Sequence, residues 1–236
     1  MRQWWFVLFG LLISFVSPSS PDGVRATTLG GAQTPNISID DISIKQDMDV
    51  SGYPAKIIEQ ILSGTGVPAG LAESESCSSE PTASLKVRQG VTIREALDNF
   101  VAQNRDYRWV LDGGVVDVIP RRAPALLDAR VHSFQADIKE AEMGFPLFEL
   151  MGLPEVQKRA AELKLKSGIW QGGLGAYEEH PEPKKPPASF HISAKDLPLR
   201  EVLNSIVRAY PGAIWIYSET QQCDGEGTYI LGLRPN

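Results

Sequence analysis

The sequence predicts an α+β protein in which a small module of strand, helix and hairpin occurs twice in tandem. The stretch TIREAL at 92–97 has a second, more divergent copy, PLREVL, at 198–203. Each stretch opens a segment whose apolar residues recur at helical spacing. Segments rich in β-branched and aromatic residues precede and follow both helices. Because strand and helix patterns are interleaved in both places, we expect a mixed fold with a helical insert between the modules.

The N-terminal segment 1–26 has the pattern of a secretory signal peptide. Arg2 is followed by an apolar run from Trp4 to Val16, and a polar stretch leads to the small residue Ala26. The run is shorter than the roughly 20 residues that a membrane-spanning helix needs, although a permanent anchor is the alternative. We therefore expect an exported chain without a membrane span after cleavage. Residues 27–43 are expected to form a flexible lead-in.

The charge balance argues against nucleic acid as a partner. Removal of residues 1–26 changes 23 basic and 29 acidic residues to 21 and 28, which leaves an acidic chain. Non-specific nucleic-acid binding depends on clustered Lys and Arg. The pair Lys184 and Lys185 lies between prolines and is interpreted as a solvated linker.

The first module is predicted over residues 44–122. The loose alternation of 37–50 indicates a strand, and Pro54 suits the first turn of a helix that continues to Leu62. A short strand is expected at 67–71 and a loop at 72–82.

The second half of this module carries the clearest pattern. Residues 84–88 alternate as a strand, and Thr92 with Glu95 has the spacing of a capping box. Two strands at 107–111 and 115–119 flank an Asp-Gly-Gly turn, which indicates a hairpin. The helix between them carries one apolar stripe, formed by Ile93, Ala96, Leu97, Phe100 and Val101.

The second module is predicted over residues 188–236. The apolar stripe returns there with Leu199 in the place of Ile93, and at the same offset Trp215 corresponds to Trp109. Between 93–111 and 199–217, five of nineteen positions are identical. Two unrelated units that share a common stripe are the alternative to a duplication. The stripe of the second helix consists of Leu199, Val202, Leu203, Ile206 and Val207.

Residues 123–187 are predicted to connect the modules. A strand is expected at 130–138 and helices at 146–151 and 154–165. Residues 166–187 are rich first in Gly and then in Pro, which predicts an exposed loop.

The stretch TASLKVRQGVTIREALDNFVAQNRDYRWVLDGGVVDVIP resembles the secretin and TonB short N-terminal domain. The resemblance extends over residues 44–119, because the helix at 54–62 and the TG-V that follows match the first half of that domain. The second copy matches less well, since Pro198 stands where a Ser or Thr cap is usual. The shared positions are core and cap positions, so they carry information about the fold and almost none about a site.

The resemblance implies a small α+β domain, located in the periplasm or associated with the outer membrane, that contacts other proteins. Such domains stand before the channel of outer-membrane secretins and before the barrel of transducing TonB-dependent receptors. We therefore expect a non-enzymatic interaction module, accessory to such a transport or signalling system, whose partner is another envelope protein. No cofactor or metal is expected.

The alternative is an exported enzyme of unrecognised type with a site near residues 172–180. Three histidines, His132, His180 and His191, are scattered without a recognisable nucleophile motif. The Gly-rich stretch 172–175 is interpreted as a flexible loop, and 178–180 as a solvated charged loop. Trp109 and Trp215 could stack sugars or a peptide, although their positions in strands favour core packing.

The two cysteines, Cys77 and Cys223, allow a single disulfide bond, which would suit an exported chain. Two unpaired thiols are the alternative. A zinc site would need about four ligands, and no second cysteine lies near either one in the sequence.

Overall fold

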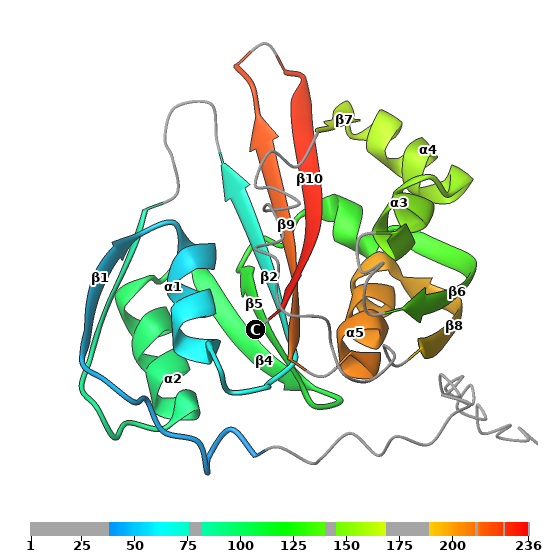
Figure 1. Cartoon of the computed structure of the whole chain (residues 1–236). Helices are drawn as coiled ribbons and strands as arrows, with labels where there is room; N and C mark the ends of the chain where they lie inside the picture. The colour runs from blue at the N-terminus through cyan, green and yellow to red at the C-terminus, as the bar shows by residue number, and fades with distance from the viewer. Residues whose placement is uncertain are drawn as a thin grey trace, which may run out of the picture.

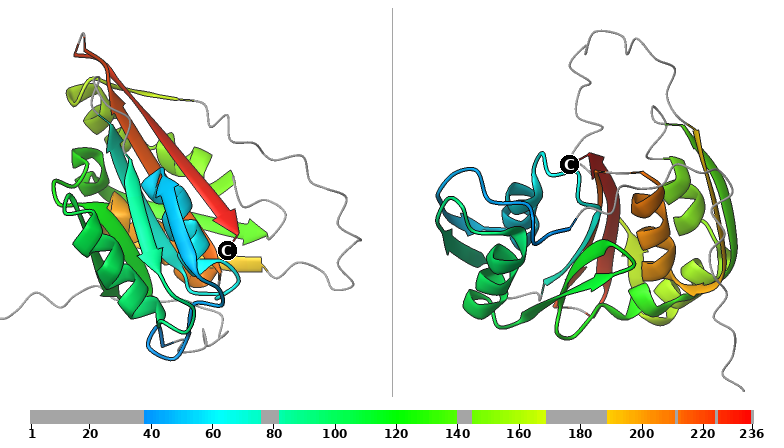
Figure 2. Two further views of the ribbon diagram at one scale, coloured as in Figure 1. Left: turned by 90° about the vertical axis from the view of Figure 1, so that its left-hand side faces the viewer. Right: turned by 90° about the horizontal axis from the view of Figure 1, so that it is seen from below.

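The computed structural model describes residues 38–75, 82–139, 145–168, 189–210, 212–223 and 225–235. These residues form helices and strands in a mixed order, which confirms the predicted α+β class. The elements stack in five layers (Figure 1). A central sheet carries helices on both faces, and a two-stranded ribbon covers each helical layer, as the view from below shows (Figure 2).

The first unit follows the order strand, helix, strand, strand, helix, strand, strand. Its two helices lie between the antiparallel ribbon β1–β3 and the strands of the central sheet, where the order is β4-β5-β2. The elements are β1 (Met48–Gly52), α1 (Pro54–Leu62), β2 (Ala69–Glu75), β3 (Ala83–Val87), α2 (Ile93–Gln103), β4 (Tyr107–Asp112) and β5 (Val115–Pro120).

The second unit repeats this order with one additional α-helix and a preceding short 3₁₀ helix. Its ribbon is β6–β8, and its strands of the central sheet have the order β9-β10-β7. In both units the hairpin is antiparallel, and a third strand pairs in parallel with the second strand of the hairpin, β2 with β5 and β7 with β10. The elements are the short 3₁₀ helix η1 (Ala125–Asp128), β6 (Arg130–Lys139), α3 (Phe145–Met151), α4 (Pro154–Glu162), β7 (Leu165–Ser167), β8 (Ser189–Pro198), α5 (Leu199–Ala209), β9 (Ala213–Gln221) and β10 (Gly227–Pro235).

Strands β2 and β9 join the two units into one six-stranded sheet, β4-β5-β2-β9-β10-β7. They are parallel over seven residue pairs, from Ala69 opposite Ile214 to Glu75 opposite Thr220. The strand order is the same in both units, yet the strand directions are reversed. The second unit is therefore inverted relative to the first, and its helices cover the opposite face. Each face has its own apolar core.

Local geometry repeats at the offset that the sequence shows. Helices α2 and α5 have equal lengths, and they begin at the corresponding residues Ile93 and Leu199. The backbone N–H groups of Asn104 and Tyr210, which follow the helices, donate to the carbonyls of Phe100 and Ile206. The N-termini differ. A reciprocal capping box with Glu95 begins α2, whereas α5 has no side-chain cap.

Three predicted boundaries are wrong. The strand expected over 37–50 begins only at Met48, because residues 38–41 turn and only a bridge at Ser43 precedes β1. The expected loop at 72–82 begins later, since β2 continues to Glu75 beside β9. The helix expected over 154–165 ends at Glu162, where Lys164 takes a left-handed backbone conformation and the chain enters β7.

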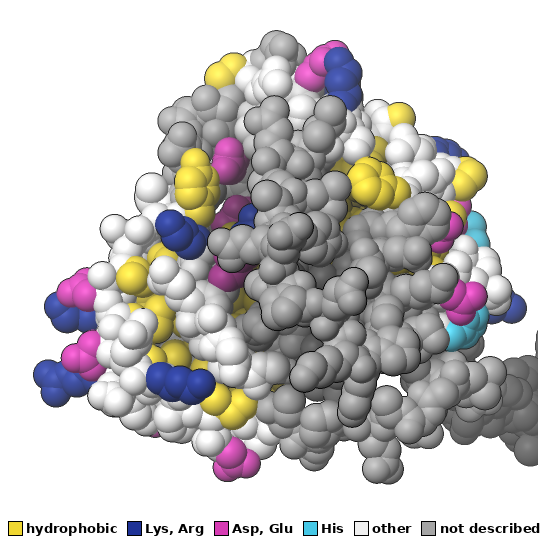
Figure 3. All heavy atoms as spheres, viewed as in Figure 1, with side chains coloured by type: hydrophobic (Ala, Val, Ile, Leu, Met, Phe, Trp, Pro, Cys, Tyr) yellow, Lys and Arg dark blue, Asp and Glu magenta, His cyan; other side chains and the backbone are white. Residues whose placement is uncertain are grey.

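None of the helices in the described part of the chain is both long and apolar enough to cross a membrane. Charged side chains of both signs are scattered over the face seen in Figure 3, without a basic patch among the described residues there.

Candidate binding groove beside strand β1

The ribbon β1–β3 has two outer edges, and their backbone groups differ in whether side chains hydrogen-bond to them. The edge of β3 is covered by the C-terminal end of α2. The backbone N–H groups of Ser84 and Lys86 donate to the side chains of Asn104 and Gln103, at 2.9 and 3.2 Å. The Asn104 amide also donates to the Ser84 carbonyl at 2.8 Å. Covering an edge in this way prevents the addition of another strand.

The same hydrogen bonds establish which backbone groups of β1 face outward. In an antiparallel pair, residues that bond to the partner strand alternate with residues that point away from it. Since Ser84 and Lys86 point away from β1, their opposite residues, Ser51 and Asp49, point away from β3. The described residues place no other strand beside β1. The backbone N–H and C=O groups of Asp49 and Ser51 are therefore directed toward an open edge.

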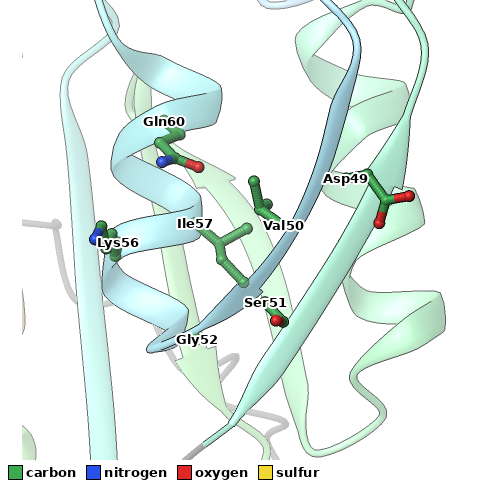
Figure 4. A pocket seen from close by; sticks show the side chains of 7 residues that line it. All are labelled: Asp49, Val50, Ser51, Gly52, Lys56, Ile57 and Gln60. Atoms are coloured by element: carbon green, nitrogen blue, oxygen red, sulfur yellow. The ribbon is translucent and has the colours of Figure 1, made fainter.

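This open edge borders a groove whose second wall is α1 (Figure 4). The groove has a volume of about 340 Å³ and is lined on the strand side by residues 49–52. Val50 and Ile57 point toward each other and form an apolar floor, and Lys56 and Gln60 line the helical side of the groove. A free strand edge beside a helix is the arrangement that accepts an extended peptide as an additional strand.

Helix α1 is fixed relative to the central sheet by two carboxylate contacts. Tyr53 at its N-cap gives no side-chain cap, and the buried Glu73 of β2 accepts instead from the Ala55 N–H at 2.6 Å. Burial raises the pKa of Glu73, and the hydrogen bond from Ala55 opposes that shift. Further along the helix, Glu59 accepts from Arg234 of β10 at 2.8 Å. The helical wall of the groove is thus held by strands from both units.

A second polar cluster is buried between the two units, with the partly exposed Arg200 at its margin. Asp117 of β5 accepts from the Asn204 side chain of α5 at 2.9 Å, and Asn204 accepts from the Trp215 indole at 2.7 Å. Arg200 is 3.9 Å from the Asp117 carboxylate, and the other oxygen of that carboxylate has no hydrogen-bond partner. Burial raises the pKa of Asp117 to about 6, although Asn204 and Arg200 lower it.

This inter-unit cluster joins the units, and its three hydrogen-bonded residues are closed to solvent. Asp117, Asn204 and Trp215 are each 0% exposed. The ring of Trp215 lies over Gly70 of β2, where a Cβ atom would come within 2.1 Å of the indole. Only glycine at position 70 lets the two strands pair with this ring between the layers.

The two described histidines do not meet in one site. His132 and His191 lie on the exposed ribbon β6–β8, where their Nδ1 atoms are 3.3 Å from Asp196 and 2.9 Å from Asp137. His180, and with it the alternative site at 172–180, lies outside the described residues, as do Lys184 and Lys185. Within the described ranges, no three His, Cys, Asp or Glu side chains are grouped in a way that could hold a metal ion.

Trp215 packs in the core, as the sequence indicated. Trp109 is half-buried, and its indole donates to Asp98 at 2.8 Å while Arg94 lies over the ring at 5.3 Å. Neither tryptophan lines the groove beside β1.

The disulfide stays a prediction, because Cys77 lies outside the described residues, as does the signal peptide at 1–26. The sheet register nevertheless favours it. The parallel pairing of β2 and β9 ends with Glu75 opposite Thr220, and the cysteines follow these residues by two and three positions. Both segments therefore leave the sheet at the same end. Peptide mapping without reductant should yield a linked pair, and complete alkylation of both thiols would contradict it.

No known protein family, curated protein or solved structure matches this chain.

Sequence reasoning did not find the groove. The signal for its strand is only the alternation MDVSG, and the residue pattern does not show which edge of a ribbon stays open. The amides of Gln103 and Asn104, at the end of an amphipathic helix, are the one local hint that the edge of β3 is covered.

Proposed function

We propose that this protein is an exported interaction module that binds an extended segment of an envelope protein along the free edge of β1. The observation that carries the proposal is the open edge at Asp49 and Ser51 beside the groove with α1. Main-chain hydrogen bonds would supply affinity, and the groove would select side chains at alternate positions of the segment.

The chemistry of the groove defines the segment that it would accept. An aliphatic side chain would cover the floor formed by Val50 and Ile57, and a carboxylate near it would lie within reach of Lys56. The Asp49 carboxylate is already paired with Lys86 at 2.8 Å, so Lys56 is the basic residue of the groove lining that can select charge.

The resemblance of residues 44–119 to the secretin and TonB short N-terminal domain supports the same proposal. The first unit has two helices between a ribbon and a sheet, and the second unit repeats this element order with an additional helix, which supports the use of one kind of module twice. We infer from it that the protein acts in the periplasm as an accessory to a secretin or a TonB-dependent system.

Site-specific photo-cross-linking in intact cells tests the proposal. A photoreactive residue at Gln60, in the groove wall, should capture an envelope protein, whereas the same residue at the exposed position Glu162 of α4 should not capture it. Ser51→Pro should abolish the capture without unfolding the protein, because the Ser51 N–H points to the free edge and proline is tolerated there. Capture that persists in this variant at full strength would contradict binding along β1.

A second proline variant distinguishes a loss of binding at the strand edge from a loss of folding stability. Val50 is opposite Leu85 and bonds to β3, so Val50→Pro should lower the melting temperature, whereas Ser51→Pro should leave it nearly unchanged. Equal melting losses in the two variants would show that the assignment of the outward groups is wrong.

A further inference from the structure

Strand β4 forms one end of the six-stranded sheet, and no described strand pairs with its outer edge. It is six residues long. Val110 and Leu111 are 37% and 46% exposed, an unusual pair of aliphatic residues for a free edge strand.

The hydrogen bonds around the hairpin define which groups of β4 point outward. The Val116 N–H donates to the Pro68 carbonyl on the far side of β5, so its opposite residue, Leu111, points away from β5. The Tyr107 N–H donates to the Asn104 carbonyl and not to β5. Tyr107 therefore also points away from β5, as expected for a residue an even number of positions from Leu111. The backbone groups of Trp109 and Leu111 therefore face the free edge.

The side chains of β4 are complementary to a second copy of the strand running in the opposite direction. With Val110 opposite its own equivalent, Arg108 of one copy lies opposite Asp112 of the other, twice in each pair of strands. On the other face, Trp109 lies opposite Leu111. In this register Trp109 of one copy and Leu111 of the other exchange backbone hydrogen bonds, which agrees with the outward direction of their backbone groups. Neither Arg108 nor Asp112 has an ion pair within the described part of the chain.

We propose that two copies of this chain associate through antiparallel pairing of their β4 strands about a two-fold axis at Val110. The occupant of the edge is a second copy, because the charges and the apolar residues are arranged self-complementarily about that one residue. Such an interface is isologous, the commonest kind in homodimers. The two six-stranded sheets become one continuous sheet, and the groove beside β1 is not used in the contact.

Charge reversal provides the most specific test. Sedimentation of the full exported chain should show a concentration-dependent dimer. Arg108→Asp and Asp112→Arg should each weaken it about tenfold or more, because each change places two like-charged pairs across the axis. The double variant Arg108→Asp with Asp112→Arg should restore the wild-type association. Failure of the double variant to recover, or a wild-type chain that stays monomeric at millimolar concentration, overturns the proposal.

Cross-linking tests the register. Residues opposite each other in a non-hydrogen-bonded pair have Cα atoms about 4.5 Å apart, within the range that a disulfide bridges. Val110→Cys should therefore form an intermolecular disulfide, mapped by mass spectrometry to position 110 in both chains. Arg108→Cys should not link to itself, but it should link to Asp112→Cys when the two variants are mixed. Cross-linking of Arg108→Cys to itself would contradict the register.

Discussion

The two tryptophans that occupy equivalent positions in the two units make the same hydrogen bond in opposite surroundings. Each indole donates to a side-chain oxygen eleven residues earlier on the helix of its own unit, Trp109 to Asp98 and Trp215 to Asn204. Trp109 lies on an edge strand beside exposed Asp98, whereas Trp215 is 0% exposed. One local geometry therefore serves a surface position in the first unit and a core position in the second.

The difference follows from where each strand lies in the sheet. Strand β4 is an edge, so no further strand covers Trp109, and the acceptor can be a carboxylate in contact with water. Strand β9 is central, beside β2, so the acceptor of Trp215 is a neutral amide that in turn donates to Asp117. Burial removes the solvation of a charged group, and an amide is the acceptor that costs less there.

The largest expected effect is common to both units. Leu97→Ala and Leu203→Ala should each lower the free energy of unfolding by about 2 to 5 kcal/mol, because both side chains are 0% exposed in close-packed cores. Chemical denaturation measures the loss. A loss below about 0.5 kcal/mol in one unit would break the equivalence of the two helices.

The next effect lies at the junction of the two units, where Gly70 of β2 is opposite Trp215 of β9. Gly70→Ala should destabilise the protein by about 3 kcal/mol, since the added Cβ would meet the Trp215 ring at 2.1 Å. Trp215→Phe removes the atoms in conflict, so the double variant should lose less than the sum of the two single losses. Additive losses in this double-mutant cycle would show that the ring does not set the requirement for glycine.

The buried carboxylate of Asp117, where β5 of the first unit contacts α5 of the second, gives a pH dependence of stability. Since the pKa of Asp117 rises to about 6 on folding, the native state binds more protons than the unfolded state between about pH 4 and pH 6. This residue therefore lowers the free energy of unfolding as pH rises through that window. The stability of Asp117→Asn relative to wild type should increase from pH 4 to pH 7 by up to about 3 kcal/mol. A difference that is constant with pH would show that Asp117 keeps its ordinary pKa.

The smallest effect compares the tryptophans directly. Trp215→Phe leaves the buried Asn204 oxygen without its donor, which should cost about 1 to 3 kcal/mol beyond the lost volume. Trp109→Phe leaves Asp98 free to bind water, so its loss should stay below about 1 kcal/mol. Equal losses, measured by denaturation at one pH, would mean that burial does not distinguish the two bonds.

Local patterns of the sequence predicted the helices and hairpins well, for a physical reason. The stripe and capping box of α2 and the matching stripe of α5 describe contacts within one short segment, where periodicity reports burial. The constant offset between the two stripes predicted the correspondence of Trp109 and Trp215 in the same way.

Long-range pairing could not be predicted from these patterns. Nothing in the residues 69–75 states that β9 lies beside them, although their apolar start is typical of a strand covered on both faces. The sequence predicts the strand at β6 but assigns it to the connecting segment, and it does not predict β7. Both strands belong to the second unit only through their pairing with β8 and β10, which local patterns do not report. Gly70 stands out only once the Trp215 ring is known to lie over it.

The junction between β2 and β9 also governs the order in which the chain can fold. Its partner residues are 145 positions apart, so β2 is made long before the strand that covers its second edge. Contacts between such distant residues slow folding, since a large loop must close before they form. Until β9 arrives, the first unit presents an apolar strand edge that can pair with other chains. A chain that is truncated before β9 should therefore aggregate even though every helix and strand of its first unit is complete.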